Sequence, residues 1–235
     1  MNNGLFAKLA ASNIRKNSKM YIPYLITCII TVAVFYILKS LSVNPGITEM
    51  VGADSLSIMM LFGCCITGIF AVIFLFYTNS FLLKRRKKEL ALFNILGMEK
   101  RHIGRTLAYE SLYTALIALA AGIGIGIALD KLMFLIISRI IDAEISLGFF
   151  ISADAIKTTI ILFGIIFLLI FLNTIRQVHV SDPIRLMQES SAGEKEPKTK
   201  WVMAIIGLAA LGFGYYLALA NDNPLTAFMI FFPSV

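Results

Sequence analysis

Residues 58–83 read IMMLFGCCITGIFAVIFLFYTNSFLL, and no Asp, Glu, Lys or Arg interrupts them. An α-helix rises about 1.5 Å per residue, so about 20 apolar residues cross a hydrocarbon core roughly 30 Å thick. The stretch therefore predicts a transmembrane helix. Because it is longer than the membrane requires, the helix must tilt or project beyond the bilayer, and the polar residues at 78–80 favour projection into the cytoplasm.

Four further apolar runs have comparable lengths: 21–38, 111–129, 156–175 and 202–220. Lys157, at the second position of the run 156–175, is the one charged residue among them. Apolar residues form 58% of the chain and charged residues 15%, whereas soluble proteins have about 45–50% and about 25%. The mean hydropathy of +0.83 agrees with these proportions. The composition excludes a soluble domain and predicts an all-α, polytopic membrane protein.

The order of these runs predicts four parts. They are a cytoplasmic N-terminal segment at 1–20, a bundle of four transmembrane helices at 21–188, a flexible cytoplasmic linker at 189–200, and a fifth span with a truncated sixth at 201–235. The linker, ESSAGEKEPKTK, mixes charges with glycine and proline and cannot bury a core. Since the last run stops about halfway through the bilayer, we expect an N-terminal fragment that includes the start of a second helical unit.

Basic residues are concentrated in three segments of the chain. Four lie in the N-terminal segment, eight between the second and third runs and five between the fourth and fifth, leaving four of the 21 elsewhere. Acidic residues divide evenly between the two sides, as the positive-inside rule allows. The pattern predicts a cytoplasmic N-terminus, and it attributes the net charge of +7 to membrane topology and contact with the lipid bilayer rather than to nucleic acid.

The connection between the second and third runs carries the most information: residues 84–109 read KRRKKELALFNILGMEKRHIGRTLAY. Its basic start is typical of membrane anchoring. Leu92, Phe93 and Leu96 then fall on one helical face, and Gly97 stands where a left-handed residue would end the helix. We expect a short amphipathic helix held crosswise beneath the membrane, covered by the membrane underside or by a cytoplasmic partner.

Two motifs in this sequence resemble the cytoplasmic signatures of FtsX-like ABC transporter permeases. The first is Arg86-x-Lys88-Glu89-x-Ala91-Leu92, with Ile95-Leu96-Gly97-Met98 and Arg101-x-Ile103; the second is Asp182-Pro183-Ile184-x-Leu186. The resemblance implies a coupling helix at about 86–97 that receives motion from an ATP-hydrolysing subunit. It assigns the ATPase-coupling interface to ten residues: Arg86, Lys88, Glu89, Leu92, Phe93, Leu96, Gly97, Met98, Pro183 and Ile184.

The ATPase is expected to be a separate protein, because a P-loop needs a Gly-Lys pair and none occurs in the chain. We therefore expect no enzymatic activity and no cofactor in the chain itself, ATP being bound by the partner. The short connection after the first run resembles the bacitracin-resistance type of permease. That likeness implies a multi-pass protein of the bacterial cytoplasmic membrane. Its ligand would be a peptide antibiotic or the lipid-linked target of one, and its role would be export, protection or sensing. A sensor histidine kinase is a further possible partner that the resemblance implies.

An alternative of another class stays open: an ATP-independent signalling or scaffold protein that partners a sensor kinase or a regulator of cell-wall enzymes. Gly122-Ile123-Gly124-Ile125-Gly126 lacks the spacing of a dinucleotide loop. Ala118, Gly122 and Gly126 instead repeat every four residues, which predicts close helix packing in lipid. His102 and His179 match no metal-binding motif, so no metal or catalytic site is expected.

Overall fold

The computed structural model describes residues 3–48, 53–140, 151–180 and 201–220, and every regular element in these ranges is helical. Four of the helices are long and apolar enough to cross a membrane, over Ser18–Ser42, Asp54–Arg86, Lys100–Ile137 and Ala153–Gln177. The all-α, polytopic membrane class predicted from composition is confirmed. The chain separates into two compact units, Met1–Ser191 and Ala192–Val235.

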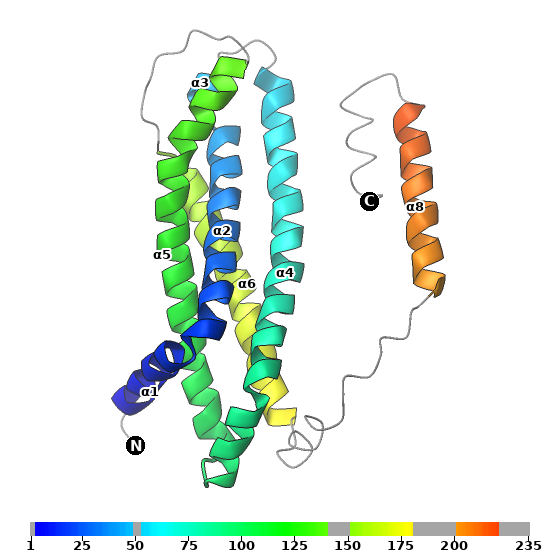
Figure 1. Ribbon diagram of the computed structural model, residues 1–235. Coiled ribbons are helices and arrows are strands. Elements are labelled where there is room, and N and C mark those ends of the chain that lie inside the picture. Colours follow the sequence, from blue (N-terminus) through cyan, green and yellow to red (C-terminus); the bar gives the residue numbers. More distant parts are fainter. Residues whose placement is uncertain (1–2, 49–52, 141–150, 181–200, 221–235) are drawn as a thin grey trace. The chain divides into compact units, whose positions relative to one another are not determined.

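The first unit is a bundle arranged around α2 (Ser18–Ser42), which packs against the three other long helices (Figure 1). These are α4 (Ala53–Ile95), α5 (Lys100–Ile140) and α6 (Ala153–Val180). The core combines apolar side chains of all four, and Cys28 and Val32 of α2 are fully buried in it. As the central helix, α2 contacts each of the other three, which also contact one another.

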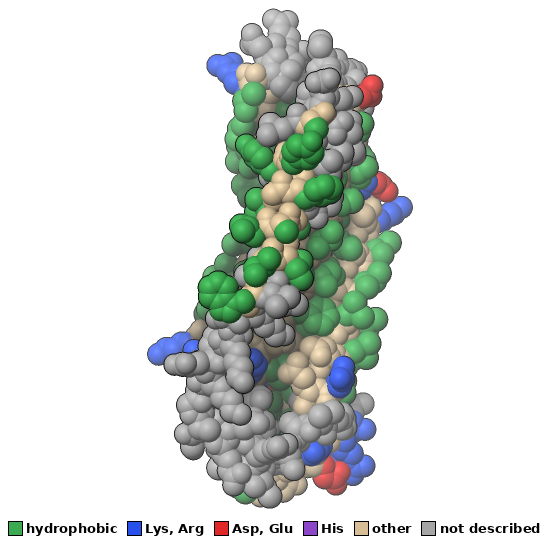
Figure 2. Space-filling view, turned by 90° about the vertical axis from the view of Figure 1, so that its right-hand side faces the viewer, with side chains coloured by type: hydrophobic (Ala, Val, Ile, Leu, Met, Phe, Trp, Pro, Cys, Tyr) green, Lys and Arg blue, Asp and Glu red, His purple; other side chains and the backbone are tan. Residues whose placement is uncertain are grey.

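The outward faces of α4 and α6 are apolar, as a lipid-facing surface requires. Phe70 of α4 is 64% exposed and Ile161 of α6 is 63% exposed. On the face that Figure 2 shows, hydrophobic side chains lie in the middle, and charged side chains lie mostly toward the ends. The hydrophobic surface would be costly in water but fits a bilayer, where helices need no polar outer face.

α4 has 43 residues and α5 has 41, so each is about 60 Å long and exceeds the hydrocarbon core about twofold. α4 continues without interruption through the basic run, as expected for a helix that projects beyond the membrane. Residues 132–137, a short apolar segment after the third run, extend α5 rather than forming a separate helix. A short helix, α3 (Pro45–Thr48), lies between α2 and α4.

The N-terminal segment forms a helix that the hydropathy pattern did not indicate. α1 (Asn3–Lys16) lies at an angle to the bundle and contacts α5 (Figure 1). Phe6, Ala10 and Asn13 are buried on its inner side, whereas Lys8 and Arg15 are exposed. The helix is therefore amphipathic along its length and attached to the bundle by its apolar face.

The small residues of α5 lie where this helix meets α2. Ala118 is fully buried, and a Cβ atom at Gly122 would lie 2.6 Å from Cβ of Val32. At Gly126 it would lie 2.8 Å from the ring of Tyr36. Close backbone approach at these positions explains why α2 and α5 share a large contact.

In the second unit, the predicted fifth span forms α8 (Trp201–Leu219), with an apolar stretch at Ile205–Tyr216. The predicted linker at 189–200 and the predicted sixth span both lie outside the described residues.

Candidate functional site

The segment between the second and third spans forms a helical hairpin that continues the two spans. Its first arm is the C-terminal part of α4, up to Ile95, and its second arm is the start of α5 at Lys100. The expectation of a separate crosswise helix is wrong, because no residue between Lys84 and Leu92 breaks the helix. In Figure 1 the last turns of α4 slant toward the lower end of α5.

Gly97 makes the turn of the hairpin. Its φ is +93°, the left-handed conformation that was predicted for this position. The Met98 N–H donates to the carbonyl of Phe93 at 2.9 Å, and the Gly97 N–H donates to the carbonyl of Asn94 at 3.1 Å. These two bonds form a Schellman motif, which satisfies carbonyls at the end of α4. The Asn94 side chain also donates to the carbonyl of Met98, at 3.2 Å, and fixes the turn.

A small apolar cluster holds the two arms together. Ile103 and Leu107 of α5 are buried in it, and Leu90, Phe93 and Met98 pack against them. Phe93 therefore faces the interior of the hairpin, and the prediction that it shares an outward face with Leu92 and Leu96 is wrong. Phe93 stabilises the hairpin and is poorly placed to contact another protein.

Three large apolar side chains remain uncovered at the end of the first arm. Leu92 is 52% exposed, Ile95 is 59% exposed and Leu96 is 73% exposed. Exposed Lys84, Arg85 and Arg101 lie on the same hairpin. We call Leu92, Ile95 and Leu96 the tip patch; exposed apolar side chains grouped in this way are typical of a protein-binding surface.

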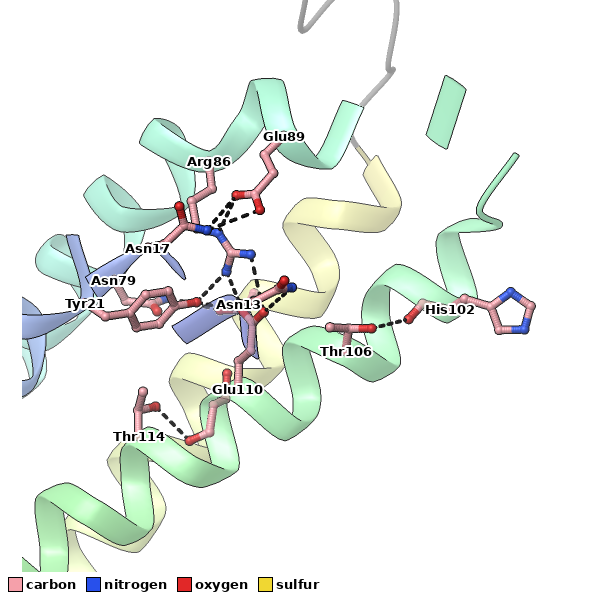
Figure 3. Close-up of polar contacts among 12 residues, drawn as sticks. Asn13, Asn17, Tyr21, Asn79, Arg86, Glu89, His102, Thr106, Glu110 and Thr114 are labelled. Carbon is pink, nitrogen blue, oxygen red and sulfur yellow. Dashed lines mark hydrogen bonds and ion pairs between the residues drawn. The ribbon is translucent and has the colours of Figure 1, made fainter. Parts of the chain in front are cut away.

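Arg86, at the base of the hairpin, is buried, with 2% of its surface exposed. Its guanidinium forms an ion pair with Glu110 of α5, and it also donates to the hydroxyl of Tyr21 in α2 (Figure 3). A second nitrogen of Arg86 lies 3.3 Å from the other Glu110 carboxylate oxygen. The resemblance assigns Arg86 to the ATPase-coupling interface; in the structure its side chain is buried and joins α4, α5 and α2 internally.

The Glu110 carboxylate has two further partners. Tyr21 donates its hydroxyl proton to one oxygen at 2.6 Å, and Asn13 of α1 donates to the other at 3.0 Å. Removing a charge from water costs several kcal/mol, and a buried pair offsets this cost only when its remaining hydrogen-bonding positions are also filled. Asn13 and Tyr21 fill two of these positions, so the pair is compatible with burial.

Glu89 belongs to the same group of residues and not to the tip patch. It accepts a hydrogen bond from Nε of Arg86 at 3.2 Å and lies 3.1 Å from the side-chain nitrogen of Asn17, just before α2. We call Asn13, Asn17, Tyr21, Arg86, Glu89 and Glu110 the polar junction. It connects both arms of the hairpin to α1 and α2.

The predicted interface residues therefore divide into three groups. Leu92, Leu96 and Gly97 are exposed at the tip, while Arg86, Glu89, Phe93 and Met98 make contacts within the hairpin or at its base. Pro183 and Ile184 lie outside the described residues, and the side chain of Lys88 is likewise not described. In the ranges that the structure describes, no three His, Cys, Asp or Glu side chains are grouped as a metal site.

Part of this sequence matches a known protein family, and the chain resembles several known proteins. Residues 60–179 match a family described as FtsX-like permease C-terminal. The chain is 28% identical over 228 residues to the ABC transporter permease YvcS of Bacillus subtilis, a match that covers 96% of this chain and 35% of that protein.

Two relatives are named bacitracin export permease protein BceB. The one from Bacillus subtilis is 26% identical over 90% of this chain and 33% of its own length, and the one from Halalkalibacterium halodurans is 28% identical over 89% and 33%. The chain thus spans about a third of the length of these relatives. Since the family match extends over just over half of the sequence and includes the hairpin and both flanking spans, the chain belongs to the FtsX-like permease family.

Proposed function

We propose that the chain is part of the membrane subunit of an ABC-type module in which a separate ATPase hydrolyses ATP and binds the tip patch. The exposure of Leu92, Ile95 and Leu96 carries this proposal. These side chains lie at the end of a helix that projects well beyond a membrane span, where lipid does not cover them. An apolar cleft on a cytoplasmic partner would remove this surface from water.

The orientation that supports this arrangement follows from charge. Four basic residues in and next to α1 and eight on or near the hairpin belong to one side of the membrane. By the positive-inside rule this side is the cytoplasm, so the N-terminus and the tip patch both face the compartment that contains ATP. The membrane is then the bacterial cytoplasmic membrane.

The names of two relatives support a role in resistance to peptide antibiotics. The module would act on a peptide antibiotic or its lipid-linked target at the outer face, and a sensor histidine kinase would be a second partner. We expect the described helices to contribute motion to this process; their outward surfaces are apolar, as contact with lipid requires.

Charged substitutions in the tip patch test the proposal. Leu92→Asp combined with Leu96→Asp should leave membrane insertion and thermal stability unchanged, since both side chains are exposed. The amount of co-purifying ATPase should fall at least about tenfold, because two carboxylates would be desolvated in the interface. Lys8→Asp on the exposed side of α1 is the matched control and should retain the ATPase.

Full recovery of the ATPase with the double variant would contradict docking at the tip patch. If the unaltered permease retains no ATPase at all, the ATP-independent signalling function becomes the better interpretation.

A further inference from the structure

The inference concerns how α2 takes part in the ATP-driven motion, and it rests on the proposed function. α2 is the central helix of the bundle, yet the tip patch lies wholly on α4. A partner that pushes the hairpin therefore has no direct contact with α2 through this patch. Besides the apolar packing of α2 against α4 and α5, a polar contact near the base of the hairpin can transmit the displacement.

The polar junction provides such a contact. Tyr21 of α2 donates to Glu110 on one arm of the hairpin and accepts from Arg86 on the other, as Figure 3 shows. The guanidinium is planar, so its bonds to two partners restrict its orientation. The adjacent cavity measures about 20 Å³, which leaves room for little more than one water molecule. The junction therefore cannot absorb a displacement by rearranging freely.

α1 braces this junction from the side. At one end, the ring of Phe6 stacks on His102 with centroids 5.7 Å apart, and the guanidinium of Arg105 lies 6.0 Å from the same ring. At the other end, Asn13 binds Glu110 at 3.0 Å. α1 is therefore fastened at two points along the first part of α5, which keeps the second arm in a fixed position relative to α2.

We propose that Tyr21, Arg86 and Glu110 are positioning residues that pass the displacement of the hairpin to α2, with α1 as the brace that keeps the second arm in register. The motion of α2 then reaches the outer end of the bundle along its contacts with α4, α5 and α6. The hydroxyl of Tyr21 is the atom that joins α2 to both arms at once.

Tyr21→Phe tests this role with a minimal change. The variant keeps the buried ring and the Arg86–Glu110 ion pair, and it removes the hydroxyl hydrogen bonds that join Tyr21 to both arms. Thr174→Val is the matched control: the Thr174 hydroxyl accepts a buried hydrogen bond from Asn79 at 2.9 Å, so this variant breaks one polar contact between α4 and α6 and leaves the hydrogen bonds of Tyr21 in place.

The measurement uses the natural full-length permease co-purified with its ATPase, with the native cysteines replaced and spin labels at Val43→Cys and Ile151→Cys. These positions lie at the ends of α2 and α6 opposite the hairpin. The distance between the labels is compared without nucleotide and with the ATPase trapped in its ATP-bound state. We expect a shift in the otherwise unaltered complex and in Thr174→Val, and loss of most of that shift in Tyr21→Phe with undiminished ATPase recovery.

A full shift in Tyr21→Phe would overturn the inference, and so would an unaltered complex whose labels do not move. Equal losses in Tyr21→Phe and Thr174→Val, in step with falling unfolding temperatures, would also overturn it, since they would show a purely structural role. If the proposed function itself is wrong, the ATPase will be absent from the purified complex before any label distance is measured. This outcome is therefore distinguished from a failure of the inference about Tyr21.

Discussion

Gly122→Ala is predicted to destabilise the bundle, although it adds a single methyl group. The new Cβ would lie 2.6 Å from Cβ and 2.7 Å from Cγ1 of Val32, and 3.0 Å from the carbonyl oxygen of Ile29. The last contact is with backbone, so a side-chain rotation cannot relieve it. α2 and α5 would have to separate near the middle of their shared contact. Gly124→Ala is the matched control, because a Cβ there meets nothing within 4 Å.

The expected size follows from two opposing terms. Overpacking a close contact costs about 1–3 kcal/mol. Replacing glycine by alanine inside a helix stabilises it by roughly 0.5–1 kcal/mol, and this gain applies at both positions. We therefore expect a net loss of about 1–2 kcal/mol for Gly122→Ala and a gain of up to about 1 kcal/mol for Gly124→Ala.

Thermal unfolding of the purified protein in detergent measures the difference. At this chain length, 1 kcal/mol corresponds to roughly 2–4 °C, so the two variants should differ by several degrees. If they unfold at the same temperature, or if Gly122→Ala is the more stable, then α2 and α5 do not approach as closely as described. The small-residue repeat would then have another cause.

Two further predictions concern the hairpin. Gly97→Val should lower ATPase recovery more than Gly97→Ala. A φ of +93° penalises every Cβ by about 1–2 kcal/mol and penalises a β-branched side chain most. Equal recovery with the two variants would argue against the left-handed turn. Leu96→Cys should react with a membrane-impermeant maleimide in inverted vesicles but not in intact cells, and Ile151→Cys should show the reverse, because these two exposed positions lie at opposite ends of the bundle. Labelling of Leu96→Cys from outside would reverse the proposed orientation.

The transmembrane bundle was predictable because a bilayer imposes a simple requirement on sequence. A helix must present about 20 residues without charge, and hydropathy detects that requirement without knowledge of the neighbours. The turn at Gly97 was predictable for a similarly local reason, since a helix end needs a residue that tolerates positive φ. The four-residue repeat that includes Gly122 predicted close helix packing, but it did not indicate that the partner helix is α2.

The polar junction was not predictable by the same rule. Glu110 lies directly before the uncharged run at 111–129, so a search for uninterrupted apolar segments ends one residue short of it. α1 escaped detection because it is too short and too polar to be a span. Its periodicity was nevertheless present: Phe6, Ala10 and Asn13 follow a spacing of four and three residues and form its buried side.

The basic run at 84–88 illustrates why a run of charges does not by itself show which of its side chains is buried. A helix turns 100° per residue, so consecutive charges in such a run must point in different directions. Lys84 and Arg85 are exposed and can serve the positive-inside signal, whereas Arg86 continues the inward stripe that begins with Asn79 and Leu82 and ends with Phe93. A cation placed on that stripe requires a buried anion on a neighbouring helix. In a related sequence with a basic residue on such a stripe, the acidic residue nearest the start of the next span is therefore the expected ion-pair partner.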